Sequence, residues 1–218
     1  MLIPYTSPAQ PFRTEIIIQK SRFIADIAPV RTMEEAQDFW KARQKEFRDA
    51  THHCFACRIG VTQVLEKSSD DGEPQGTAGH PMLRVLQMRE LTNAVIIVTR
   101  YFGGIKLGAG GLTRAYSGSA AEAAAGAALL RYTPHVAVTL TLPYDLLGLF
   151  EKYAAGKDMR IEGRDFTDKV TLSLLVPPAS WAVYEKELTD MTAGRIEVET
   201  GDEVYVALPT LEKIKNEE

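Results

Sequence analysis

The chain has little cysteine: only Cys54 and Cys57 occur among its 218 residues. Two cysteines this close together do not build the disulfide framework of a small secreted protein. Long hydrophobic runs are also missing, since no stretch reaches the roughly 18 apolar residues of a membrane span. Prolines interrupt the first residues, where a signal peptide needs an apolar core. We therefore expect a reduced, cytoplasmic protein without a membrane partner.

Negative charge is absent from one long segment. No Asp or Glu occurs between residues 91 and 121, although the whole chain has a net charge of −4. Residues 1–130 hold 15 Lys and Arg against 13 Asp and Glu, which leaves +2, whereas residues 131–218 hold 10 against 16, which leaves −6. The net charge argues against broad nucleic-acid binding, so any contact with phosphate is expected in the first part.

The hydrophobic pattern changes character near RYTP, residues 131–134. This change predicts two domains, at 1–130 and 135–210, followed by a frayed tail at 211–218. The second domain has the order β-α-β-β-α-β, which is the ferredoxin-like arrangement. The predicted fold class is therefore α+β.

Local patterns place several elements within these domains. The segment RTEIIIQKSRFIADIAPV predicts two strands, or one strand with a bend near Ser21. AVIIVTRYF, residues 94–102, is almost continuously apolar and predicts a strand buried on both faces. An alanine-rich helix is expected from residue 111 or 112 to about residue 130, and Asp145 is expected to cap a later helix.

The segment RYFGGIKLGAGGLTRAY, residues 100–116, concentrates glycines and cations. A glycine-rich loop exposes backbone N–H groups, and the helix after it directs its positive dipole end at the loop. Together these features predict an anion or nucleic-acid site. The candidate residues are Arg100, Gly103, Gly104, Lys106, Gly108, Gly110, Gly111 and Arg114.

Known phosphate motifs do not fit this loop. Ala109 stands where the P-loop needs lysine, and Thr113 stands where the dinucleotide fingerprint needs its final glycine. A nucleotide triphosphatase or a Rossmann dehydrogenase is therefore not expected. The alternative that the glycines only allow close packing of strand and helix stays open.

An acidic loop precedes the glycine loop, and its candidate residues are Asp71, Gly72, Glu73 and Gly76. The carboxylates of the acidic run Asp70, Asp71 and Glu73 could bind Mg²⁺ beside a phosphate, or the loop could be solvated and contain a type I turn at Asp71–Gly72. They could equally fix the loop by accepting hydrogen bonds from backbone N–H groups or from Arg100 and Arg114. In that case the cations would be partly neutralised.

His52 and Cys54 are weak catalytic candidates. Alternation along a strand places both on one face, where a Cys–His nucleophile pair is conceivable, although a strand cysteine is more often part of the core. His53 and Cys57 then point to the other face, so the four side chains cannot converge on a metal. We expect no metal site and no cofactor.

Three segments together resemble the Impact family, which includes bacterial YigZ-like proteins and eukaryotic relatives. They are ATHHCFACRIG, DGEPQGTAGHPML and VTRYFGGIKLGAGGLTRAYSGSA, and they cover residues 50–120 in the family's order. The resemblance implies a first domain similar to domain 2 of ribosomal protein S5 and a ferredoxin-like second domain similar to the last domain of elongation factor G. Cys57 departs from the family pattern, which often has an aromatic residue there, and this weakens a Cys-x-x-Cys interpretation.

The resemblance implies a role linked to translation and stress. Eukaryotic members regulate translation by interfering with activation of the kinase that responds to amino-acid starvation. Two classes of function remain. One is a non-enzymatic factor that contacts the ribosome, RNA or a translation-regulatory protein through the basic glycine loop, and the sequence favours it. The other is an enzyme acting on a phosphorylated small molecule or nucleotide at the same loop.

Overall fold

The computed structural model describes residues 1–210, and the predicted tail at 211–218 lies outside the described residues. The chain divides into two compact units. Among the described residues, the first unit contains 4–132 and 207–210, and the second contains 133–206 together with 1–3. The predicted α+β class with two domains is confirmed. Within residues 1–210, no helix has the length and apolar character needed to cross a membrane.

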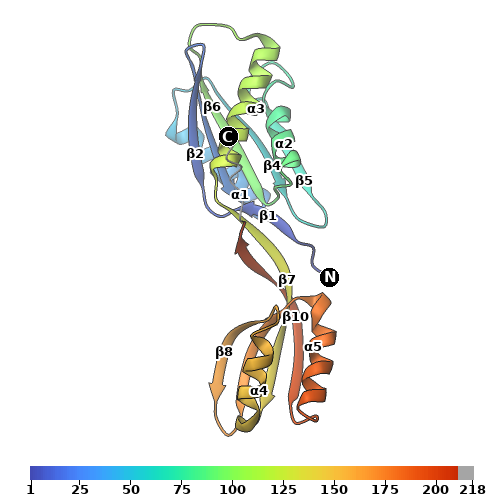
Figure 1. Cartoon of the computed structure of the whole chain (residues 1–218). Helices are drawn as coiled ribbons and strands as arrows, with labels where there is room; N and C mark the ends of the chain where they lie inside the picture. Colours follow the sequence, from blue (N-terminus) through green and yellow to red (C-terminus); the bar gives the residue numbers. More distant parts are fainter. Residues whose placement is uncertain (211–218) are drawn as a thin grey trace, which may run out of the picture. The chain divides into compact units, whose positions relative to one another are not determined.

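The first unit is built around a five-stranded antiparallel sheet whose faces are covered by helices. Helix α1 (Met33–Glu46) packs on one face, while α2 (Gly79–Met88) and α3 (Gly108–Gly126) lie together on the other (Figure 1). The central strand, β6 (Ala94–Tyr101), is therefore buried on both faces, as the apolar run at residues 94–102 predicts. The strands in spatial order are β2 (Phe12–Ile18), β3 (Ser21–Pro29), β6 (Ala94–Tyr101), β4 (His52–Ile59) and β5 (Leu65–Ser69).

A tight turn separates β2 from β3. Gln19 and Lys20 have φ values of 46° and 67°, so both central residues are left-handed, as in a type I′ hairpin turn. The sequence predicted either two strands or one strand with a bend near Ser21, and the structure has two strands. The turn brings Lys20 beside Gly103 of the glycine loop, since a Cβ added to Gly103 would lie 2.0 Å from the Lys20 carbonyl carbon.

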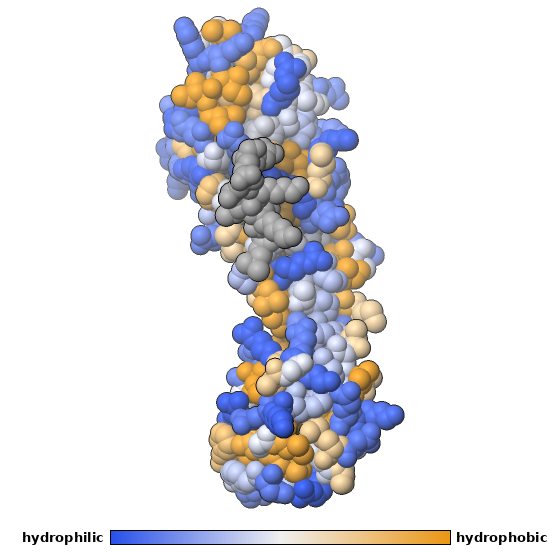
Figure 2. Space-filling model, viewed as in Figure 1, coloured by the Kyte–Doolittle hydropathy of each residue, from blue (hydrophilic) through white to orange (hydrophobic). Residues whose placement is uncertain are grey.

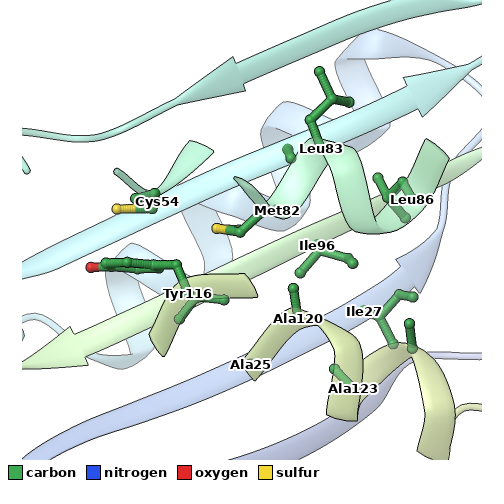
Figure 3. Close-up of a cluster of buried hydrophobic side chains, with 14 of the residues drawn as sticks. Ala25, Ile27, Cys54, Met82, Leu83, Leu86, Ile96, Tyr116, Ala120 and Ala123 are labelled. Atoms are coloured by element: carbon green, nitrogen blue, oxygen red, sulfur yellow. The ribbon is translucent and has the colours of Figure 1, made fainter. Parts of the chain in front are cut away.

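Small side chains let α3 lie close to the sheet. Ala120 and Ala123 face Ile27 and Ile96 in the buried cluster (Figure 3). The helix begins at Gly108 and ends at Gly126, whereas the sequence predicts 111 or 112 to about 130. It ends early because residues 129 and 130 pair with strand β1 (Tyr5–Pro8). This pairing overrides the local helix propensity.

The second unit has the predicted β-α-β-β-α-β order. Its sheet has the strand order β10, β7, β9, β8, as expected of a ferredoxin-like domain. Pro143 is the N-cap residue of α4, so the predicted cap Asp145 is wrong; it lies in the first turn and its carboxylate pairs with Arg195 at 2.8 Å. The elements are β7 (Leu129–Leu142), α4 (Tyr144–Ala154), β8 (Arg160–Phe166), β9 (Val170–Val176), α5 (Pro178–Met191) and β10 (Glu197–Pro209).

The segment at 131–134, where the sequence pattern changes, lies inside β7, so the chain passes between the units as a strand and not as a loop. Pro134 has no N–H to donate, yet the strand tolerates it. The reason is its position: pairing with β1 ends at Tyr132 and pairing with β9 starts at Val136. Residues 1–3 also belong to the second unit, which no local sequence pattern indicates.

Candidate functional site

A buried carboxylate fixes the acidic loop. Glu73 is 8% exposed, and its Oε1 accepts hydrogen bonds from Arg100 Nη1 at 2.6 Å and from the Tyr116 hydroxyl at 2.7 Å. Burial raises the pKa of Tyr116, and the neighbouring Cys54 and Glu73 raise it further, so the phenol stays protonated and donates. One carboxylate therefore joins the acidic loop to β6 and to α3.

Asp70, another member of the acidic run, fixes the next part of this loop. Its carboxylate accepts hydrogen bonds from the backbone N–H groups of Gly76, Ala78 and Gly79 at 2.8, 3.0 and 2.8 Å. Burial raises the pKa of Asp70, but these three donors outweigh that effect and lower it overall. The loop is thus fixed by its own backbone.

The turn at Asp71 and Gly72 differs from the predicted type I turn. Their φ values are 44° and 85°, and the Glu73 N–H donates to the Asp70 carbonyl at 2.9 Å, which together describe a type I′ turn. Asp71 Oδ2 accepts from the His53 backbone N–H at 2.6 Å. Across residues 1–210, no group of three or more His, Cys, Asp or Glu is arranged to hold a metal.

The two weak catalytic candidates have different environments. The His52 Nδ1 lies 2.7 Å from the Asp71 carbonyl oxygen, which can only accept, so Nδ1 carries a proton and donates it to this bond. That Nε2 is 3.9 Å from Glu73 Oε1. The Cys54 thiol is fully buried, donates to the Asp70 carbonyl at 3.0 Å, and has a pKa raised by burial. Cys54 is therefore not available as a thiolate nucleophile.

Three of the five glycines in the loop are explained by the path of the chain. Gly103 approaches the backbone of Lys20 too closely for a Cβ, and Gly104 and Gly108 have φ values of +85° and +70°. Gly111 is tight but possible, because a Cβ there would lie 3.0 Å from Leu107 Cβ. Gly110 is different: an added Cβ would meet only the flexible end of Arg114, at 3.6 Å. The fold itself does not require a glycine at that position.

The three predicted cations Arg100, Lys106 and Arg114 lie in different environments. Arg100 is 5% exposed and is bound to Glu73, so it is part of the scaffold. Lys106 and Arg114 are exposed and form no ion pair within residues 1–210. Leu107, the N-cap residue of α3, provides no side-chain acceptor, so the first-turn N–H groups of the helix lack a capping side chain. The loop therefore presents two unpaired cations and a helix N-terminus.

A cavity of about 430 Å³ lies between the glycine loop, the acidic loop and the start of β4. The sequence analysis named candidate residues in each of these three segments but missed the apolar side chains that also line the cavity. The only sequence signal for them was the presence of Phe102 and Leu107 inside the glycine loop. The lining residues are Thr51, His52, Glu73, Pro74, Arg100, Phe102, Lys106, Leu107, Gly108, Ala109 and Leu112.

A second hollow, of about 330 Å³, lies between α2 and α3 and adds a cation, Arg84, that the sequence analysis missed. Its walls include the exposed His80 and Arg84 from α2, together with Thr113 and Ser117 from α3. Figure 2 shows hydrophilic and hydrophobic residues close together at the end of the first unit that carries the glycine loop. The positive surface therefore extends from the loop onto α2.

The Glu73–Arg100 pair can be tested by removing the charge of one partner. We expect Glu73→Gln to lower the free energy of unfolding by about 3 kcal/mol, because it leaves a buried guanidinium without a counter-charge. The measurement is urea denaturation followed by circular dichroism. Glu15→Gln, which breaks an exposed pair with Arg22, is the matched control and should leave the midpoint unchanged. Equal midpoints for the two variants would contradict this role of Glu73.

The two glycine environments predict opposite stability changes. Gly110→Ala should raise the free energy of unfolding by up to about 1 kcal/mol, because alanine restricts the unfolded chain and fits the helix. Gly103→Ala should lower it, since its Cβ would overlap the Lys20 backbone. Thermal denaturation of both variants checks the pair. A destabilised Gly110→Ala variant would show that the fold does require this glycine.

The environment of Asp70 predicts a pH dependence of stability. Because its folded-state pKa lies below the ordinary value of 3.8, ionised Asp70 stabilises the fold above that pH, and the contribution is lost as pH falls through the folded-state pKa. Asp70→Asn should therefore be less stable than the wild type at pH 7, by an amount that shrinks below about pH 4. Urea denaturation from pH 7 to pH 3 measures this. A deficit independent of pH would contradict it.

Comparisons with known proteins agree with this architecture. Residues 19–124 match the Impact N-terminal domain, and residues 140–195 match a domain of unknown function, DUF1949. The IMPACT family member YvyE of Bacillus subtilis is 35% identical over 206 residues, which cover 94% of this chain and 95% of that protein. YigZ of Escherichia coli, also an IMPACT family member, is 36% identical over 88% of this chain and 95% of its own length.

More distant and structural comparisons extend this result. Protein IMPACT of Rattus norvegicus is 32% identical over 95 residues, which cover 41% of this chain and 29% of the rat protein. A crystal structure described only as that of a hypothetical protein is 34% identical and matches with a TM-score of 0.60, covering 93% of this chain and 99% of the other. The identities and coverages with the two bacterial relatives establish that the chain belongs to the Impact family.

Proposed function

We propose that this protein is a translation-linked regulator whose first unit contacts RNA phosphates on the ribosome. The contact surface consists of the glycine loop and the adjoining exposed faces of α2 and α3. One observation carries the proposal: Lys106, Arg114 and Arg84 are exposed and form no ion pair within residues 1–210. Between Glu73 and Glu122 the only acidic residue in the sequence is Glu90.

Unpaired cations matter because phosphate binding is driven largely by the release of counterions from the nucleic acid. A cation already bound to a carboxylate gains little from a phosphate, and for this reason Arg100 is left out of the proposed contact surface. The N-terminus of α3 adds backbone N–H donors next to Lys106. Phe102 and Ile105, 46% and 41% exposed, flank the same loop and offer apolar surface to an unstacked base.

The link to translation is supported by family membership. Eukaryotic members of the Impact family regulate translation, and the similarity to rat Protein IMPACT covers less than half of this chain. The names of the bacterial relatives state no activity. The role is therefore assigned to the first unit, where the Impact N-terminal domain matches.

An enzyme acting on a phosphorylated substrate is less well supported. Of the proposed nucleophile pair, Cys54 is buried and protonated, and only His52 lines the cavity. The carboxylates of Asp70 and Glu73 are occupied by protein donors. These contacts favour binding without catalysis.

Charge reversal tests the contact surface. We expect the variant Arg84→Glu/Lys106→Glu/Arg114→Glu to lose co-sedimentation with purified ribosomes, while the wild type binds in a salt-dependent manner. Each phosphate contact removed should reduce the slope of log K against log salt by about 0.7 to 0.9. The experiment measures the bound fraction across a salt series.

The control variant is Lys41→Glu/Lys45→Glu/Lys67→Glu, which makes the same charge change at exposed positions of α1 and β5. It should bind ribosomes nearly as well as the wild type. Equal losses in the two variants would mean that net charge alone matters, and unchanged binding by the first variant would refute the proposed surface. Circular dichroism establishes that both variants are folded.

A further inference from the structure

We propose that the 430 Å³ cavity beside the glycine loop is a separate binding site for a phosphate monoester on a planar ring, that is, a nucleoside 5′-monophosphate. Its volume lies within the range of roughly 300 to 1,000 Å³ typical of small-molecule sites. Its walls come from four separate segments, around residues 51–52, 73–74, 100–102 and 106–112. The cavity shares Lys106, Phe102 and the N-terminus of α3 with the contact surface proposed above, but binding of a small ligand in it does not require RNA.

One wall of the cavity suits an anion. Lys106, Gly108 and Ala109 line it, so an unpaired ammonium group and the N-terminus of α3 meet at one place. Arg100 also lines the cavity, where its guanidinium is paired with Glu73. Because Glu73 balances only one of the two cations, this wall retains a net positive charge that favours a phosphate.

Other walls suit a ring. Phe102, Leu107, Leu112 and Pro74 give the cavity an apolar lining, and Phe102 is 46% exposed. An aromatic face of this kind stacks on a base, whereas inorganic phosphate or a sugar phosphate would leave it unused. The ligand class therefore combines a phosphate with a planar ring.

Polar groups at the start of β4 can select among such ligands. The orientation of His52 is fixed by its hydrogen bond to the Asp71 carbonyl, which leaves Nε2 for a hydrogen bond with a ligand. The Thr51 Oγ1 already accepts from the Phe102 backbone N–H at 3.1 Å, so its hydroxyl proton remains free to donate. The scaffold formed by Arg100, Glu73 and Tyr116 holds the surrounding walls in place before a ligand arrives.

Isothermal titration calorimetry on the full chain tests the site, with AMP, GMP, CMP and UMP as probes. We expect at least one of them to bind at least tenfold more tightly than its own nucleoside and than ribose 5-phosphate. A four-nucleotide RNA with and without a 5′-phosphate distinguishes the two sources of the ligand. Preference for the free nucleotide indicates a metabolite, and preference for the phosphorylated RNA indicates a strand end; both support the site. Absence of binding by all four nucleotides would overturn it, as would equal binding of ribose 5-phosphate.

Variants separate this site from the RNA surface. Ala109→Phe places a large side chain at the cavity wall on an exposed helical position and should weaken nucleotide binding at least tenfold. Lys106→Ala, an exposed truncation that leaves the fold intact, should weaken it severalfold. Arg84→Glu/Arg114→Glu should leave it within twofold, while reducing ribosome binding. A folded Ala109→Phe variant that binds nucleotide as the wild type does would refute the cavity as the site.

Discussion

The arrangement of the first unit depends on one buried carboxylate. Glu73 accepts hydrogen bonds from Arg100 and Tyr116, so three elements distant in the sequence share a single anchor. Removing one partner from such a pair is costly, whereas replacing a whole buried ion pair by apolar residues is often neutral or stabilising. The pair therefore matters for positioning more than for net stability. It fixes the acidic loop against β6 and α3, and so it also fixes two walls of the cavity.

The same anchor determines where positive charge is available. Arg100 has the right side chain for a bidentate phosphate contact, but its charge is balanced inside the protein. Unbalanced charge is left at Lys106 in the loop and at Arg114 on α3, a helix that has no acidic residue in its first turn. One loop can therefore combine a structural role with the proposed binding role, because different cations and different glycines carry the two.

Sequence patterns predicted those features that are local. The apolar run of β6 and the β-α-β-β-α-β order of the second unit follow from periodicity and were confirmed. Pairings between distant segments were not predictable. Arg100 and Glu73 are 27 positions apart, Arg100 and Ser21 are 79 apart, and no periodicity links them. Residues 129 and 130 likewise pair with strand β1, although local helix propensity places them in α3.

The candidate site shows the same limit in chemical terms. The residue type of Glu73 is compatible with binding Mg²⁺, with exposure to solvent or with fixing the loop, and only its contacts decide among these roles.

The five glycines of the loop present the same ambiguity. Together with the neighbouring cations they are typical of an anion site, but glycines also allow a strand and a helix to pack closely. The structure assigns Gly103, Gly104 and Gly108 to the path of the chain. Gly110 has no such reason, and a glycine in a helix that the fold does not require costs stability. Close approach of a ligand to the backbone is the remaining physical reason for a glycine there, and Gly110 lies in the first turn of α3, close in sequence to both unpaired cations.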